Sequence, residues 1–111
     1  MKLYNFTSNT YGPTWFVCAE NREAAIEAAK LAVKAKLERM LSLRDEERIK
    51  YANCANSLKS ISKREDCDRS AADDDLKFID CCANNLPQYH GGEKCSLDEV
   101  EPRVVIMSEV S

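Results

Sequence analysis

Apolar and polar side chains alternate at the start of the chain. In KLYNFTS, residues 2–8, Tyr4 and Phe6 share one face while Leu3 lies on the other, and a period of two is typical of a β-strand. The Asn, Gly and Pro of the following NTYGP indicate a turn. The β-branched and aromatic run TWFVCA, residues 14–19, indicates a second strand. Together these segments predict an N-terminal antiparallel β-hairpin.

The strongest helical pattern follows this hairpin. Asn21 is a candidate N-cap, and residues 22–41 consist almost wholly of strong helix formers. Apolar residues recur there at intervals of three and four positions, at Ile26, Ala29, Val33, Leu37 and Met40. This stripe predicts an amphipathic helix.

Helix-forming residues continue beyond this stripe, but the apolar positions change phase. The next stripe comprises Tyr51, Cys54, Ala55, Leu58 and Ile61. We therefore expect a bend or break near residues 42–45, where Ser42 and Asp45 have the spacing of a capping-box variant. One continuous helix through this region would exceed ~60 Å, which is too long to pack on a small sheet.

A similar pair, Ser70 and Asp73, predicts the start of a third helix. Its apolar stripe comprises Ala72, Leu76, Ile79, Cys82, Ala83 and Leu86. Asn85 and Pro87 are expected to end it.

The last part of the chain changes from polar to apolar. Residues 87–101 indicate a polar loop, and the alternating pattern of RVVIMSEV, residues 103–110, indicates a strand beside the hairpin. The predicted order is β-β-α-α-α-β, an α+β fold in which two or three helices pack on a small antiparallel sheet. A length of 111 residues predicts one domain spanning residues 1–111.

Composition excludes several classes of protein. Sixteen basic and 19 acidic side chains give a formal net charge of −3, so we expect no direct binding to nucleic acid. No apolar run has the ~18–20 residues of a membrane span, and the opening residues have no apolar signal region, so we expect a cytoplasmic protein. The sequence contains no P-loop, nucleophile elbow or dinucleotide fingerprint, and we expect neither enzymatic activity nor a cofactor.

Six cysteines are many for a protein of this compartment, and we expect reduced thiols. Thiolate and imidazole groups of Cys81, Cys82, His90 and Cys95 form a candidate zinc site, with Cys67 as a further ligand. Against it, no C-x-x-C pair is present. Cys54 and Cys82 also fall on apolar stripes, where a free cysteine acts as a small hydrophobic residue.

Charge is distributed unevenly along the predicted helices. Residues 29–44 hold five basic side chains against one acidic, and residues 65–80 hold seven acidic against two basic. Either these charges pair between helices, or the acidic segment offers a negative surface to a basic partner. The candidate contacts are Glu65, Asp66, Asp68, Asp73, Asp74 and Asp75, with Tyr89 and His90 as loop contacts.

The pattern MKLYNF…TWFVCAENREAAIEAAKLAV…RVVIMSEV resembles that of small phage and mobile-element proteins, including several anti-CRISPR proteins. In these, a strand hairpin leads into an amphipathic helix through a stretch like CAENREAAIEAA, and a short strand closes the chain. The resemblance covers residues 1–35 and 102–110. It implies a non-enzymatic inhibitor that occupies a surface of a host defence complex, which is a protein or ribonucleoprotein.

The resulting hypothesis is a small protein-binding inhibitor that blocks a CRISPR-type complex through an acidic surface. Two alternatives stay open. One is a zinc-stabilised structural or regulatory domain, and the other is a homodimer in which the apolar helical stripes pair between chains.

Overall fold

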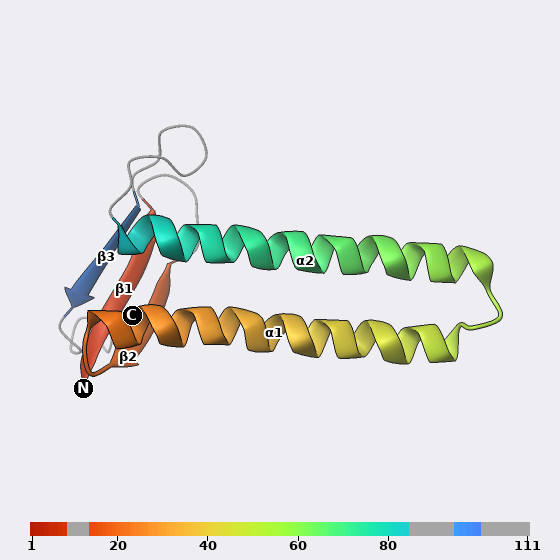
Figure 1. Ribbon diagram of the computed structural model, residues 1–111, viewed down its shortest axis with the longest axis horizontal. Coiled ribbons are helices and arrows are strands. Elements are labelled where there is room, and N and C mark those ends of the chain that lie inside the picture. Colours follow the sequence, from red (N-terminus) through yellow and green to blue (C-terminus); the bar gives the residue numbers. More distant parts are fainter. Residues whose placement is uncertain (9–13, 85–94, 101–111) are drawn as a thin grey trace, which may run out of the picture. The chain divides into compact units, whose positions relative to one another are not determined.

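The computed structural model describes residues 1–8, 14–84 and 95–100 of the chain. These residues form an α+β fold in the order β1 (Lys2–Ser8), β2 (Trp15–Ala19), α1 (Arg22–Lys50), α2 (Ala55–Ala83) and β3 (Cys95–Val100), shown in Figure 1. The chain divides into two compact units. We call Met1–Lys30 with Lys77–Ser111 the sheet unit, and Leu31–Leu76 the hairpin unit.

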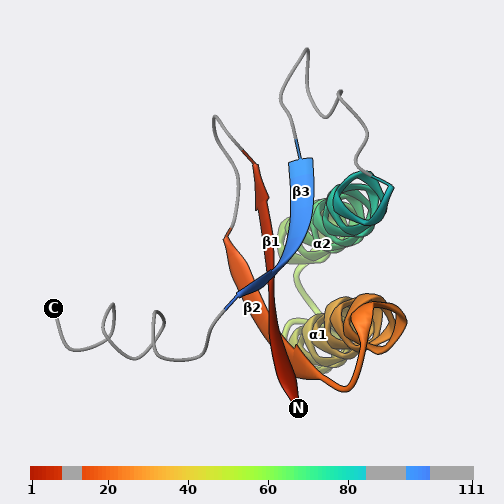
Figure 2. The ribbon, with the colours of Figure 1, turned by 90° about the vertical axis from the view of Figure 1, so that its left-hand side faces the viewer.

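The sheet unit contains three antiparallel strands in the order β2-β1-β3, so that β1 lies in the middle (Figure 2). Phe6 of β1 lies opposite both Trp15 of β2 and Leu97 of β3. Residues directly opposite one another in a sheet share a face. One face of the sheet therefore carries an apolar row, and two of its three members, Phe6 and Leu97, are buried.

The last turns of α2 cover this face of the sheet. The ring of Phe78 meets that of Trp15 edge to face, with centroids 5.2 Å apart and planes at 74°. Phe6, Phe78, Ile79 and Cys82 are fully buried, which confirms the inward stripe predicted for Ile79 and Cys82. Edge-to-face aromatic contact adds to the free energy already gained from burying both rings.

Hydrogen bonds from two side chains hold the start of α1 in place within the sheet unit. The Asn21 side-chain oxygen accepts a hydrogen bond of 2.8 Å from the backbone N–H of Ala24, which confirms Asn21 as the N-cap. The Arg22 guanidinium donates to the carbonyl of Leu97 at 2.8 Å and to the carbonyl of Ala83. Ala83 is the last residue of α2, so its carbonyl has no acceptor role within that helix, and Arg22 satisfies it.

In the hairpin unit, α1 continues through the position of the predicted break. Residues 42–45 are helical, and the break comes instead at residues 51–54. The stripe of Val33, Leu37 and Met40 does not end. It continues three to four residues at a time into Arg44 and Arg48, which are half-buried charged residues. The break was predicted too early, because charged residues replace apolar ones on this side of α1 and the out-of-phase stripe begins only at the turn after Lys50 and continues into α2.

The same effect explains why α2 is one helix and not two. Ser70 and Asp73 lie inside α2 and cap no new helix, so the predicted third helix is wrong. Ile61 and Ala72 are buried, and the positions between them with the same spacing are Glu65 and Asp68, both half-buried. The second predicted stripe is only partly right, because its first three residues, Tyr51, Cys54 and Ala55, are exposed at the turn and the helix start.

The third described strand lies in a segment that was predicted as a loop. Cys95–Val100, predicted as part of a polar loop, forms β3 and pairs with β1 from Leu3↔Val100 to Ser8↔Cys95. Cys95 and Leu97 are the buried residues of this strand. Because the next two residues, Asp98 and Glu99, are both acidic and exposed, the sequence shows no clear alternation of apolar and polar positions. The strand predicted at residues 103–110 lies outside the described residues. Neither described helix is apolar enough along its length to cross a membrane.

Candidate functional site

The candidate acidic residues of α2 fall into three groups by position. The first group, Glu65 and Asp68, points between the two helices of the hairpin unit. Asp68 accepts a hydrogen bond of 2.9 Å from Arg44 Nε, and Glu65 accepts one from Arg48. The Arg44 and Asp68 side chains are only 13% and 14% exposed. These two acids therefore connect α2 to α1 within the hairpin unit.

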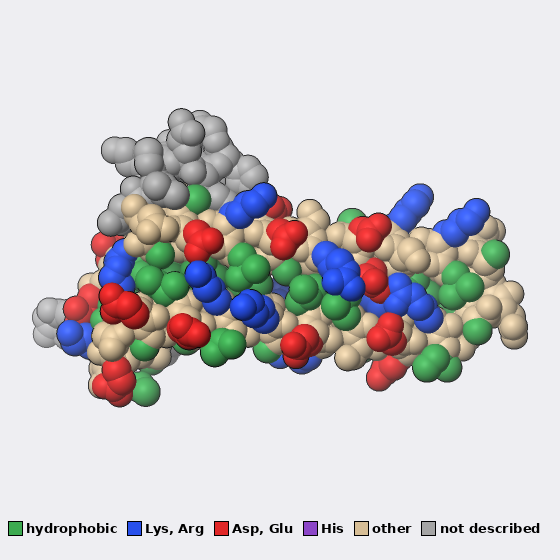
Figure 3. All heavy atoms as spheres, viewed as in Figure 1, with side chains coloured by type: hydrophobic (Ala, Val, Ile, Leu, Met, Phe, Trp, Pro, Cys, Tyr) green, Lys and Arg blue, Asp and Glu red, His purple; other side chains and the backbone are tan. Residues whose placement is uncertain are grey.

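Further arginines and carboxylates extend this pair of contacts into a network. The Glu47 carboxylate forms ion pairs with the guanidinium groups of Arg44 and Arg64, with N···O distances of 2.5 Å and 2.8 Å. Asp45 forms an ion pair with Arg48 at an N···O distance of 2.9 Å, and Glu65 forms a second ion pair, with Arg69, at 3.5 Å. Four arginines thus meet four carboxylates, and the network carries no net charge. Figure 3 shows the same balance on one face of the molecule, where basic and acidic side chains are interspersed.

The network shifts the ionisation of its members in the direction that favours the charged forms. Hydrogen bonds from Arg44 hold the pKa of Glu47 below its ordinary value, and hydrogen bonds from Arg48 do the same for the pKa of Glu65. The pKa values of Arg44 and Arg48 rise for the reciprocal reason, through their bonds to Asp68 and Glu65. Glu47 and Glu65 therefore stay charged at lower pH than an ordinary glutamate does.

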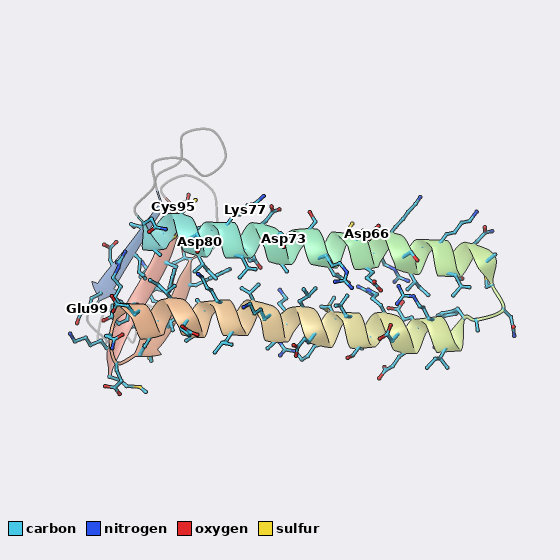
Figure 4. All side chains as sticks on the ribbon, viewed as in Figure 1. Asp66, Asp73, Lys77, Asp80, Cys95 and Glu99 are labelled. Carbon is cyan, nitrogen blue, oxygen red and sulfur yellow. The ribbon has the colours of Figure 1, made fainter. Side chains whose placement is uncertain are left out.

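The second group, Asp66 and Asp73, lies on the exposed side of α2. The two residues are seven positions apart, about two turns, so they share a side of the helix (Figure 4). Both side chains are exposed, and neither forms an ion pair with any residue in the described ranges. They are therefore available for contact.

The third group is the adjacent pair Asp74 and Asp75. Asp74 is exposed, and Asp75 lines a hollow between the helices of the hairpin unit. The hollow has a volume of about 160 Å³ and an apolar floor, and its lining comprises Val33, Lys36, Leu37, Met40, Asp68, Ala71, Ala72 and Asp75. Burial raises the pKa of Asp75, although the charge of Lys36 acts in the opposite direction. A carboxylate beside an apolar floor is a place where a further cation is favoured.

Asp66 and Asp75 lie on opposite sides of α2. Nine residues separate them, about two and a half turns of helix. The sequence treated all six acids as one surface, but the helix divides them. The apolar residues of the hollow, Val33 and Met40 among them, were missed as contacts because their spacing marked them only as core.

The candidate zinc ligands are divided in a different way. Cys81, Cys82 and Cys95 are buried in the sheet unit, and the Cys82 thiol donates to the Thr7 carbonyl at 3.7 Å. Burial raises the pKa of Cys82 to about 12, with the neighbouring Cys95 thiol adding to the rise, and burial also raises the pKa of Cys81. Both shifts favour the neutral thiol, which suits a buried cysteine that packs as a small hydrophobic residue.

Within the described ranges, no group of three or more His, Cys, Asp or Glu residues could hold a metal ion. His90 and Tyr89, which were predicted as a metal ligand and as a loop contact, lie outside those ranges. Cys54 was predicted as a core residue, but it is exposed, and Ser57 Oγ donates to its sulfur at 3.1 Å. Hydrogen bonds from Ser57 and from the backbone of Asn56 lower the pKa of Cys54.

Comparison with known proteins adds no relative to these observations. No protein-family model, curated protein or solved structure matches the chain. The function must therefore be argued from the geometry of the chain itself.

Proposed function

We propose that the protein is a small non-enzymatic module that binds another protein at the hollow between α1 and α2 of the hairpin unit. The observation that carries this proposal is the combination of an apolar floor with the carboxylate of Asp75 in one lining. The surface is thus both apolar and acidic, which suits a partner that offers a basic side chain with an apolar stem.

The size of the hollow supports a side chain as its occupant. Ligand pockets for small molecules usually have volumes of about 300–1,000 Å³, and the hollow has about 160 Å³. A lysine or arginine can lay its methylene groups on Val33 and Met40 and bring its charge to Asp75. Electrostatic attraction of this kind speeds association and selects the partner.

The resemblance to anti-CRISPR proteins supports a narrower proposal for the partner. A CRISPR-type complex holds nucleic acid on basic surfaces, and a protein that fills such a surface blocks it. We accordingly propose a basic protein or ribonucleoprotein surface in the cytoplasm of a bacterial host as the target. Asp66 and Asp73, which are exposed on the other side of α2, then contribute to long-range attraction and not to the contact itself.

A pull-down from bacterial lysate with the tagged protein tests this proposal. The wild type should retain one stoichiometric partner at low salt and less of it at moderate salt. Asp75→Lys should lose the partner, and the matched control Asp66→Lys, with the same charge change on the opposite side of α2, should keep it. Lys36→Ala should retain more partner, because it removes the competing cation from the hollow.

Mass spectrometry of the captured partner decides the narrower proposal, and far-UV circular dichroism checks that each variant is folded. Capture of a CRISPR-type complex supports the proposed target class. Loss of the partner with Asp66→Lys and retention with Asp75→Lys would move the contact to the other side of α2. A bait that captures nothing at either salt concentration contradicts the binding function.

A further inference from the structure

The outer edge of β2, which faces away from β1, has no partner strand among the residues that the structure describes. The order β2-β1-β3 gives β2 one neighbour, and no other strand in the described part of the chain pairs with it. Figure 2 shows β2 at one edge of the sheet, beside β1. An edge strand presents a row of free backbone N–H and C=O groups, which is a template for another extended chain.

Natural edge strands are protected by charged residues, proline or bulges, and β2 has none of these. Its sequence, WFVCA, contains no charged residue and no proline. Its register with β1 runs one to one from Lys2↔Ala19 to Phe6↔Trp15, without a bulge. The strand is therefore regular, and within residues 1–8, 14–84 and 95–100 no other strand pairs with its outer edge.

The side chains of β2 add an apolar surface to this open backbone. Trp15 faces α2 through its contact with Phe78, so Phe16 and Cys18 lie on the opposite face of the sheet. Phe16 is 50% exposed, and Cys18 is exposed. An exposed aromatic residue on an open edge is typical of a surface that pairs with another strand.

The other edge of the sheet does not have these properties. β3 carries Asp98 and Glu99 side by side, both exposed. Pairing this strand with a copy of itself would bring acidic residues together across the seam, and like charges opposite one another destabilise a sheet. The two edges thus differ in charge, and only β2 is compatible with itself.

We propose that β2 pairs antiparallel with β2 of a second copy of the chain, so that two three-stranded sheets join into one across a twofold axis. This proposal does not depend on the proposed function, because β2 lies in the sheet unit and the hollow lies in the hairpin unit. It also differs from a dimer formed by the helical stripes.

The register centred on Val17 explains why a second copy fits. Each Val17 then meets Val17 of the other copy, and Phe16 lies opposite Cys18, so that a large side chain covers a small one. The nearest charged residue, Glu20, comes opposite Thr14, so no like charges meet. A surface that is complementary to itself forms a closed, isologous contact and not an open chain.

The first test is the molar mass of the full chain by light scattering over a concentration series. The wild type should approach the mass of a dimer as concentration rises. Phe16→Lys should weaken dimerisation about tenfold or more, because it places two cations at the seam and removes an aromatic contact. The control Ile49→Lys introduces the same charge at a residue that is 80% exposed in the hairpin unit, and it should dimerise like the wild type.

Amide hydrogen exchange at low and high concentration distinguishes this dimer from a helical one. Residues 15–19 should gain protection as concentration rises, while the exposed side of α1 should not. A wild type that stays monomeric at every concentration overturns the proposal. So does a dimer that survives Phe16→Lys but is lost with Ile49→Lys, or one whose protection rises in the helices alone.

Discussion

The contacts that stabilise the interior of the sheet unit differ in kind from those that stabilise the interior of the hairpin unit. In the sheet unit, Phe6, Phe78 and Ile79 are fully buried and form an apolar core. In the hairpin unit, the corresponding inward positions of α1 and α2 hold Arg44, Arg48, Glu65 and Asp68. One unit depends on burial, and the other depends to a large extent on paired charges.

This difference has consequences for stability and for function. Apolar burial has no direct dependence on pH and is not weakened by charge screening, whereas ion pairs weaken when a carboxylate is protonated or when ions screen the charges. The hairpin unit should therefore respond to solution conditions more strongly than the sheet unit. It is also the unit that contains the hollow, and Asp68 belongs both to the charged network and to the lining of the hollow.

The largest expected effect comes from breaking the apolar core of the sheet unit. Phe78→Ala removes a fully buried ring and its contact with Trp15, and it should lower the free energy of unfolding by ~3–5 kcal/mol. Urea unfolding followed by the fluorescence of the single tryptophan measures this loss. Leu31→Ala, at an exposed apolar residue, is the control and should change little. A loss at Phe78 no larger than at Leu31 would contradict the core described for the sheet unit.

A smaller effect is expected when the charged contact in the hairpin unit is removed. Arg44→Met and Asp68→Leu should each lower the free energy of unfolding, because each leaves one largely buried charge without its partner. The double variant should be more stable than the sum of the single changes predicts. A double-mutant cycle on urea unfolding measures this coupling, and additive changes would show that the pair contributes nothing to the hairpin unit.

These contacts also show what the sequence could and could not predict. The helix over residues 22–41 was predicted correctly because its inward positions, such as Val33 and Leu37, are apolar. The break at residues 42–45 was wrong because Arg44 and Arg48 occupy inward positions, and a pattern of hydrophobicity cannot distinguish a paired charge from a solvated one. The strand Cys95–Val100 was missed because Asp98 and Glu99 conceal its alternation.

The candidate site was predictable only in its composition. The excess of acid on one segment and of base on another was visible, and so was the alternative that they pair. Which acids pair depended on which residues of α1 lie opposite α2, and this is a property of the folded chain. The hollow involves residues from both helices, Val33 and Ala71 among them, that are far apart in sequence.

The pH dependence of stability should reveal the charged network directly. The folded-state pKa values of Glu47 and Glu65 are depressed below the ordinary value of 4.5, so their contribution is present above that value. It is lost as the pH falls below 4.5 through the folded-state values. Asp75 acts in the opposite direction, because its raised pKa means that stability falls as pH rises from 3.8 through the folded-state value.

Urea unfolding followed by far-UV circular dichroism near pH 7 and near pH 3 measures the net effect. We expect a loss of stability at low pH, because protonation removes the charges of Glu47 and Glu65, each of which pairs with two arginines. Glu47→Gln combined with Glu65→Gln should reduce this loss. Asp66→Asn combined with Asp73→Asn removes two exposed charges that form no ion pair with any described residue, and it controls for net charge. A pH dependence that the double variant leaves unchanged would place the titrating groups outside the network.

The smallest effect concerns the starts of the two helices, one of which lies in each unit. α1 begins after Asn21, whose side chain caps the helix, while α2 begins after Cys54, whose carbonyl accepts the N–H of Leu58 at 3.0 Å. Cysteine is a weaker N-cap than aspartate, and α2 has no acidic residue in its first turn. Cys54→Asp should therefore raise the free energy of unfolding by ~0.5–1 kcal/mol, measured by urea unfolding under reducing conditions. The same substitution at Cys67, which is exposed in the middle of α2, should not stabilise the protein, and equal effects at both positions would mean that a charge, and not a cap, is responsible.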